Sequence, residues 1–104
     1  MKLKTASIES LDRIIHERAR LAIVAALAAE KELSFAELRV ATGLTDGNLS
    51  VQLRTLEVAG YVSLAKSEAG GRKSRTSARL TSSGRRAFTA YLADLDRVLG
   101  RWRK

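Results

Sequence analysis

The spacing of the apolar residues changes twice along this chain, and the change limits the folds that it can adopt. Up to about residue 59 the apolar side chains recur every three or four residues, the period of an α-helix that buries one face. Just after residue 60 the spacing becomes alternate, as in a β-strand, and from residue 81 the helical period returns. The sequence therefore predicts a mainly α (α+β) fold in which helices precede and follow a β-hairpin.

Capping residues and glycines divide the first helical region into four expected helices, over about 8–15, 17–30, 34–42 and 45–59. The run Ser34-Phe35-Ala36-Glu37 has the pattern of a capping box, in which a serine and a glutamate bond free backbone N–H groups at a helix start. Gly43 suits the end of the third helix, Thr45 suits the N-cap of the fourth, and Gly60 ends it.

A hairpin and a long helix complete the expected order of elements. Gly70-Gly71 is a turn signal, so residues 61–80 are expected to form a two-stranded β-hairpin, the wing. Thr81 would cap a last helix over about 81–102. A chain of 104 residues suits one hydrophobic core. We therefore expect residues 1–104 to form a single winged helix-turn-helix domain.

The basic charge of the chain is concentrated in its second half. Nineteen Lys and Arg residues against eleven Asp and Glu give a net charge of +8. Residues 1–52 carry seven basic and seven acidic side chains, whereas residues 53–104 carry twelve basic and four acidic ones. An excess confined to the half that contains the hairpin predicts a polyanionic partner, and nucleic acid is the expected one.

The fourth expected helix has two different faces. Leu49, Leu53 and Leu56 share one face and are expected to be buried. The opposite face is small and polar, which suits contact with base edges and phosphates in a DNA groove. An ordinary solvated helix face would show the same pattern. The candidate residues are Gly47, Val51 and Arg54 on the opposite face, with Asn48 and Ser50 flanking them.

The returning strand of the hairpin carries a row of basic residues. Lys73, Arg75 and Arg79 share one face because alternate residues of a strand do, and Arg72 lies at the tip. Such a ribbon could lie along phosphates or place an arginine in the minor groove. The alternative is a charged edge that discourages strand pairing.

The last expected helix carries an apolar seam with steps of four and three residues, which continues from Phe88 to Trp102. The seam could complete the core of the single chain. We expect instead that its distal part joins two copies into a homodimer through the first and last helices. The expected dimerisation residues are Leu11, Ile15, Leu92, Leu95, Leu99 and Trp102.

Several short motifs together resemble one family: Gly47-Asn48-Leu49-Ser50, Gly60-Tyr61-Val62, Gly71-Arg72, Arg75-Thr76, Leu80-Thr81 and Gly84-Arg85. Over roughly residues 10 to 100 the chain resembles the small winged-helix transcriptional regulators related to the MarR and ArsR groups. The resemblance implies a dimer that binds DNA through the fourth helix and the wing. It implies contacts by Thr45, Asn48, Ser50 and Arg54 on the helix and by Arg72, Lys73 and Arg75 on the wing.

Composition argues against catalysis and against a bound metal or cofactor. The chain has one histidine, His16, and no cysteine, so a nucleophile, a base and an orienting group do not coexist. Metal-sensing members of the resembled family use Cys or His clusters, which this chain lacks. No polar cluster predicts a pocket for a small-molecule effector. We therefore expect no enzyme activity, no metal and no cofactor.

The expected function is a sequence-specific, DNA-binding transcriptional regulator, a repressor that binds an inverted-repeat operator as a homodimer. No apolar run has the roughly 18 to 20 residues of a membrane-spanning helix, and the first residues lack the apolar stretch of a signal peptide, so we expect a cytoplasmic protein. The alternative is a winged-helix module that binds another protein, and retention on heparin would separate the two. RNA is disfavoured because no aromatic pairs are expected to stack bases.

Overall fold

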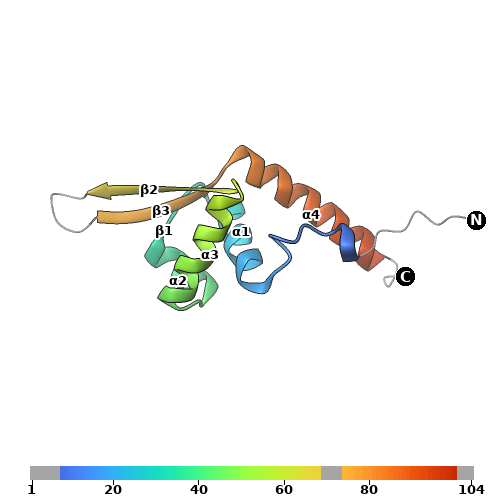
Figure 1. Cartoon of the computed structure of the whole chain (residues 1–104), viewed down its shortest axis with the longest axis horizontal. Helices are drawn as coiled ribbons and strands as arrows, with labels where there is room; N and C mark the ends of the chain where they lie inside the picture. Colours follow the sequence, from blue (N-terminus) through green and yellow to red (C-terminus); the bar gives the residue numbers. More distant parts are fainter. Residues whose placement is uncertain (1–7, 69–73, 101–104) are drawn as a thin grey trace, which may run out of the picture.

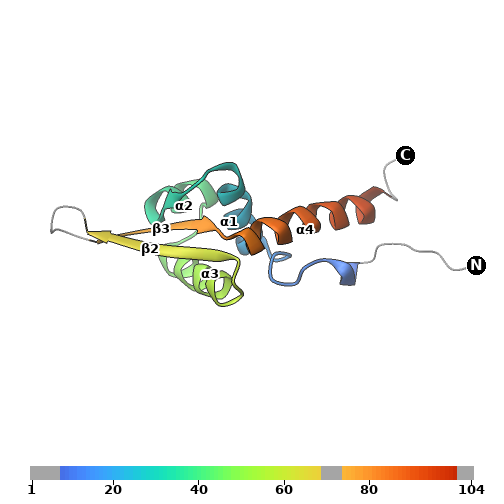
Figure 2. The same cartoon turned by 90° about the horizontal axis from the view of Figure 1, so that it is seen from above.

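The fold is a set of short helices packed under a small sheet, with a long helix that leaves it (Figure 1). It is known from a computed structural model that describes residues 8–68 and 74–100. In chain order the elements are a 3-10 turn η1 (Ile8–Ser10), α1 (Arg18–Ala29), β1 (Leu33–Ser34), α2 (Phe35–Thr42), α3 (Asp46–Val58), β2 (Val62–Glu68), β3 (Ser74–Leu80) and α4 (Ser82–Gly100). The hairpin of β2 and β3 and the helix α4 project in opposite directions (Figure 2).

Side-chain caps begin the three helices α1, α2 and α3. The Glu17 carboxylate accepts a hydrogen bond from the backbone N–H of Arg20 at 2.9 Å. Ser34 and Glu37 form the predicted capping box, with bonds of 2.8 and 3.0 Å. The Thr45 hydroxyl accepts from the N–H of Asn48 at 3.1 Å. These caps explain why the predicted ranges 17–30, 34–42 and 45–59 agree with α1, α2 and α3 to within a residue at each end.

The sheet has three antiparallel strands in the order β1-β3-β2 instead of the two that were expected. The added strand β1 pairs Leu33 with Ala78 and Ser34 with Ser77. Val62, Ala78 and Leu80 are buried on the inner face of the sheet, whereas Arg75 and Arg79 are exposed on the outer face. The predicted alternation of β3 is therefore confirmed for the described residues.

The main core lies between the inner face of the sheet and the helices α1, α2 and α3. The predicted stripe of Leu49, Leu53 and Leu56 on α3 is almost completely buried there. It packs with Ile23, Val24 and Leu27 of α1, Leu38 of α2, and Val62, Ala78 and Leu80 of the sheet. Because each of these side chains loses its water contact on folding, the orientation of α3 is set by burial.

The prediction of a helix over 8–15 is wrong. Only Ile8–Ser10 forms a 3-10 turn, and turns follow it up to α1. The cause is Asp12, whose Oδ1 accepts from the backbone N–H of Ile14 at 2.8 Å and of Ile15 at 3.0 Å. An aspartate that bonds nearby N–H groups in this way offers the backbone an alternative to the helix.

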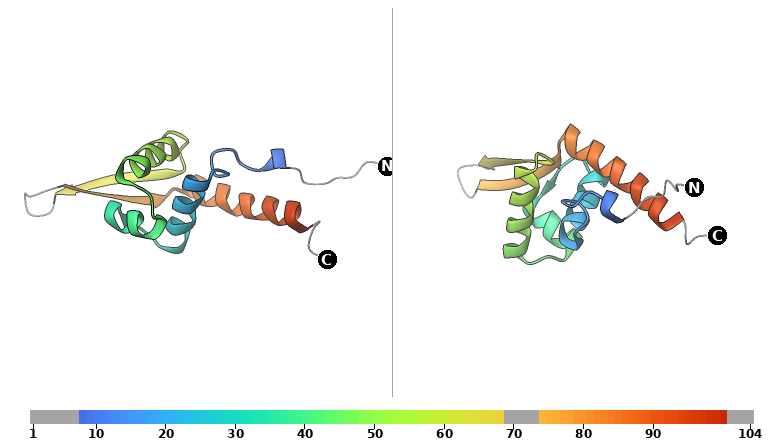
Figure 3. Two further views of the ribbon diagram at one scale, coloured as in Figure 1. Left: turned by 90° about the horizontal axis from the view of Figure 1, so that it is seen from below. Right: turned by 45° about the vertical axis from the view of Figure 1, so that its right-hand side comes forward.

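The segment before α1 lies beside α4 and shares a second core with it (Figure 3). Leu11, Ile15 and Tyr91 are buried at its centre, and Phe88 and Leu95 of α4 pack against them. The Tyr91 hydroxyl also bonds His16 Nδ1 at 2.8 Å. The proximal half of α4 therefore belongs to the core of the single chain.

The start of α4 is attached to the turn between α3 and β2. Thr81 donates from its hydroxyl to the Gly60 carbonyl at 2.6 Å and from its N–H to the Tyr61 carbonyl at 3.0 Å. Gly84 approaches the same carbonyl so closely that an added Cβ would lie 2.1 Å from the Tyr61 oxygen. A glycine is required at position 84 because no side chain fits between α4 and this turn.

Candidate nucleic-acid interface

The exposed face of α3 carries the side chains that the sequence predicted. Gly47, Asn48, Ser50, Val51 and Arg54 are all exposed. Gly47, Val51 and Arg54 lie opposite the buried leucines, and Asn48 and Ser50 flank them. Val51 has 60% of its surface exposed although it is apolar. An exposed valine among small polar groups suits contact with a thymine methyl group in the major groove.

The N-terminus of α3 combines a helix dipole with an acidic residue that is ion-paired to α2. The partial positive charge of a helix start favours phosphate. Asp46 would oppose this effect, but Arg39 of α2 lies 3.3 Å from its carboxylate. Half of the Arg39 side chain remains exposed. Helical spacing on α3 could not indicate Arg39, because Arg39 belongs to a different helix.

A chain of three polar side chains joins α1 to the exposed face of α3. Arg20 Nη1 donates to Gln52 Oε1 at 2.7 Å, and Gln52 Nε2 donates to Asn48 Oδ1 at 3.0 Å. Arg20 is itself held by the Ile14 carbonyl, to which its Nε donates at 2.6 Å. Two amides four residues apart on one helix were the available signal for Gln52. No sequence signal joined Arg20 to them.

Arg54 lies one turn further along the exposed face of α3. Its guanidinium is 3.9 Å from the Glu57 carboxylate, and 77% of its side chain is exposed. An ion pair this open is weak and can exchange its partner for a phosphate. Arg54 is therefore available for contact with a polyanion.

The wing shows only part of the predicted basic row. Arg72 and Lys73 lie outside the described residues. Arg75 is exposed on the outer face of β3 and lines a hollow that also contains Glu32 and Glu37. Glu32 accepts there from the Ser77 hydroxyl, and Glu37 accepts from the backbone N–H of Ser34 in the capping box. Lys66, which was not among the predicted residues, pairs with Thr76 across the strands and is exposed on the hairpin.

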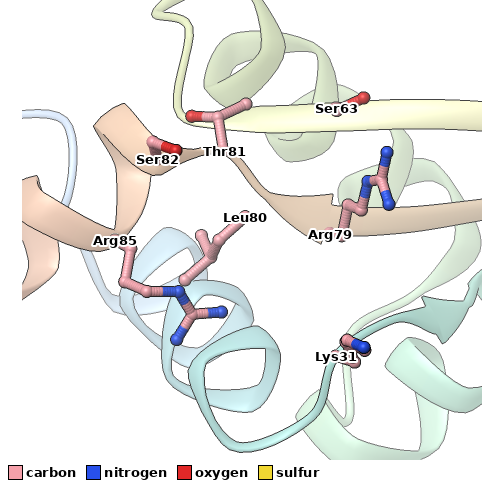
Figure 4. Close-up of a pocket in the computed structure, with 7 residues that line it drawn as sticks. All are labelled: Lys31, Ser63, Arg79, Leu80, Thr81, Ser82 and Arg85. Carbon is pink, nitrogen blue, oxygen red and sulfur yellow. The ribbon is translucent and has the colours of Figure 1, made fainter.

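Three basic residues from separate segments line one hollow where β3 leads into α4. This hollow of about 460 Å³ is lined by Lys31 before β1, Arg79 on β3 and Arg85 on α4. Figure 4 shows these side chains. Ser63, Leu80, Thr81 and Ser82 complete its lining. The predicted alignment of Arg79 with Arg75 on one strand face is correct. However, Arg79 lines the hollow with Lys31 and Arg85, whereas Arg75 lines a different one.

The six expected dimerisation residues do not form one exposed surface in the single chain. Leu92 and Leu99 on α4 are each 47% exposed. Leu95 is half-buried against the second core, and Leu11 and Ile15 are buried inside it. Trp102 lies outside the described residues. The exposed apolar surface of α4 is thus narrower than the expected seam.

The titratable side chains near α1 have structural partners. The Asp12 carboxylate accepts from the Tyr61 hydroxyl at 2.6 Å and so raises the pKa of Tyr61 to about 12. The backbone N–H of Arg20 lowers the pKa of Glu17, and burial raises that of Tyr91. Among the described residues no three His, Asp or Glu side chains gather in a metal-binding group, and no helix is long and apolar enough to cross a membrane.

Residues 19–99 match a family described as the winged helix DNA-binding domain. An uncharacterized protein of Methanocaldococcus jannaschii is 35% identical over 83 residues, which cover 80% of this chain and 89% of that protein. The structure of a transcriptional regulator homologue from Pyrococcus horikoshii OT3 superposes with a TM-score of 0.82, at 27% identity, over 89% of this chain and 91% of that one. A MarR-family regulator from Enterococcus faecalis V583 shares the fold, with a TM-score of 0.71 and 24% identity over 97% and 86% of the two chains.

Proposed function

This chain belongs to the family of winged helix DNA-binding domains, and from that premise we propose that it represses transcription by binding an inverted-repeat operator as a homodimer. The observation that carries the proposal is the exposed face of α3. Three buried leucines fix the helix, while small, polar and basic side chains cover the side that faces solvent. In this proposal α3 is the recognition helix and enters the major groove.

The side chains of the recognition helix support sequence-specific recognition of base pairs. Asn48 and Ser50 offer donors and acceptors to base edges, and Val51 offers an apolar contact. Gly47 lets the backbone approach the DNA because it has no side chain, and no other part of the described protein lies within 4 Å of its Cβ position. Thr45 caps the helix by accepting from the N–H of Asn48, and we assign its hydroxyl, as a donor, a contact with a phosphate.

The wing and the second half of the chain supply contacts with the DNA backbone. We assign phosphate or minor-groove contacts to Arg72, Lys73 and Arg75, and an added phosphate contact to Lys66. Such contacts raise affinity for every duplex and make it depend on salt. Base reading and backbone binding are therefore assigned to different elements.

The dimer is proposed to form through α4. Leu92 and Leu99 are seven residues apart, so they lie on one side of the helix, and both keep large exposed surfaces in the single chain. A second copy of α4 would cover them, with Trp102 extending the contact. Two recognition helices related by a two-fold axis would then read half-sites about one turn apart, roughly 10 base pairs.

Selection of duplexes from a random pool by the full chain tests this function. We expect enrichment of a two-fold symmetric site with half-sites spaced by one helical turn, and two chains per duplex in sedimentation. Poor retention on heparin together with no enriched sequence would contradict DNA recognition. Enrichment of a site without symmetry would contradict only the dimer.

A further inference from the structure

The hydrogen-bond chain from Arg20 through Gln52 to Asn48 has a fixed direction. An arginine side chain can only donate, so the atom of Gln52 that faces Arg20 must be its carbonyl Oε1. The Gln52 amide group is thereby oriented, and its Nε2 is left to donate to Asn48. Asn48 must in turn present Oδ1 to Gln52, which leaves its own NH₂ group for other partners.

The first member of this chain is held firmly. Only 18% of the Arg20 side chain is exposed, and its Nε donates to the Ile14 carbonyl while Glu17 lies 3.8 Å from Nη1. Arg20 also belongs to α1, whose Ile23, Val24 and Leu27 are completely buried. The series of hydrogen bonds is therefore anchored to the core through Arg20, and it ends at the exposed Asn48.

We propose that Arg20 and Gln52 are positioning residues that turn the Asn48 NH₂ group toward the DNA, so that Asn48 recognises a hydrogen-bond acceptor on a base edge. The inference rests on the proposed function, because it specifies how one residue of the recognition helix reads a base. In the major groove the acceptors are N7 and O6 of guanine, N7 of adenine and O4 of thymine. Cytosine offers a donor there, so it is the base that this position rejects.

Orientation matters because an exposed asparagine is otherwise free to present either end. A free amide could turn its oxygen toward a donor or its nitrogen toward an acceptor, and it would discriminate poorly between them. Fixing the amide before binding removes that choice and lowers the entropy lost on binding. The Arg20–Gln52–Asn48 chain therefore converts a permissive side chain into a selective one.

The variant Gln52→Glu tests the donor-to-acceptor direction of the Arg20–Gln52–Asn48 hydrogen bonds. A glutamate still accepts from Arg20, but it cannot donate, so Asn48 must turn its NH₂ group toward Glu and present Oδ1 to the DNA. In the wild-type protein we expect Asn48 to prefer a base that presents an acceptor in the major groove. In Gln52→Glu we expect it to prefer a base that presents a donor there, with the ratio of the two affinities shifting by about tenfold. Preferences at the other positions should stay the same.

Two controls separate this effect from the added negative charge. Thr55→Glu places the same charge one turn away on α3, and it should weaken all duplexes without changing the preferred base. Asn48→Ala combined with Gln52→Glu should show the weakening alone. A preference that is unchanged in Gln52→Glu, while the wild-type chain still selects a symmetric site, would overturn the positioning role and leave the proposed function intact.

Hydrogen exchange of the side-chain amides tests, without DNA, which of the two NH₂ groups donates a hydrogen bond within the protein. In the free wild-type protein the NH₂ group of Gln52 should exchange more slowly than that of Asn48, because only the former donates within the chain. In Gln52→Glu the Asn48 NH₂ group should become the protected one. Faster exchange at Gln52 than at Asn48 in the wild-type protein would overturn the proposal, whereas a wild-type chain that selected no sequence would refute the proposed function as well.

Discussion

Tyr61 donates a 2.6 Å hydrogen bond to Asp12 across 49 residues of chain and so joins the first residue of the wing region to the segment before α1. The same Asp12 carboxylate holds the turn that replaces the predicted first helix. Tyr61 also packs against both hydrophobic cores. This pair therefore connects the N-terminal segment, the sheet and α4.

Replacing Tyr61 by phenylalanine should lower the free energy of unfolding by about 1–2 kcal/mol at neutral pH, because Asp12 loses a partner at a half-buried site. The loss should depend on pH. The folded-state pKa of Tyr61 is raised from 10.0 to about 12, so its contribution is complete below pH 10 and is lost as pH rises toward 12. Urea unfolding of both proteins should show their stability difference shrinking over that interval.

The difference between the two proteins isolates Tyr61, because Tyr91 also has a raised pKa but is present in both. A stability difference that stayed constant up to pH 12 would mean that the hydroxyl does not stabilise the fold through Asp12.

Gly84→Ala should destabilise the protein by roughly 3 kcal/mol, because the new methyl group meets the Tyr61 carbonyl and neither backbone can move easily. Gly100→Ala is the matched control on the same helix, since nothing lies within 4 Å of its added Cβ. Thermal unfolding followed by circular dichroism compares them. Equal midpoints for the two variants would show that α4 can move away from the turn at no cost.

Leu92→Asp combined with Leu99→Asp should convert a dimer into a folded monomer. Both side chains are exposed in the single chain, so the charges cost little there, but they would be buried without partners in an apolar interface. Sedimentation measures the change, and operator affinity should fall with it because the linked second half-site is lost.

Leu95→Asp is the informative comparison for that pair. Leu95 packs against Leu11, Ile15 and Tyr91, so its replacement should destabilise each chain whether or not two chains associate. A double variant at 92 and 99 that remained dimeric would place the interface on another surface.

Arg75→Ala should weaken binding to all duplexes and reduce the slope of log affinity against log salt by about one unit, if one phosphate contact is lost. Asn48→Ala should instead reduce the difference between operator and random DNA. Arg97→Ala is a control, because Arg97 is exposed, pairs with Asp94 and lies on α4, away from the wing (Figure 1). A slope unchanged in Arg75→Ala would contradict a phosphate contact by that arginine.

Most of the fold was predictable because its signals are local. The caps at Ser34 and Thr45, the leucine stripe of α3 and the alternation of β3 each act over a few residues, and the structure confirms all of them. The third strand was missed because β1 has two residues, which cannot show a period. The first helix was predicted wrongly because the bonds of Asp12 outweigh the apolar spacing around it.

The candidate interface was predictable only where it lies on one element. The exposed residues of α3 follow from helical spacing, but the support of Asn48 by Arg20 depends on how α1 packs against α3. Arg75 likewise lies near side chains of β1, α2 and the loop before β1. Arg79 lies near side chains of α4 and of that same loop. Sequence spacing carries no information about such contacts between distant segments.

The attachment of Thr81 and Gly84 to the turn after α3 has a geometric consequence for a symmetric pair of chains. A 19-residue helix is about 28 Å long. A small rotation of α4 about its first turn therefore moves its C-terminal end much further than its N-terminal end. With Thr81 bonded to both Gly60 and Tyr61, the direction of α4 is locked to the C-terminal end of α3. In the proposed homodimer the angle between α3 and α4 within each chain would therefore set the distance between the two α3 helices, and so the spacing of the half-sites that they can reach.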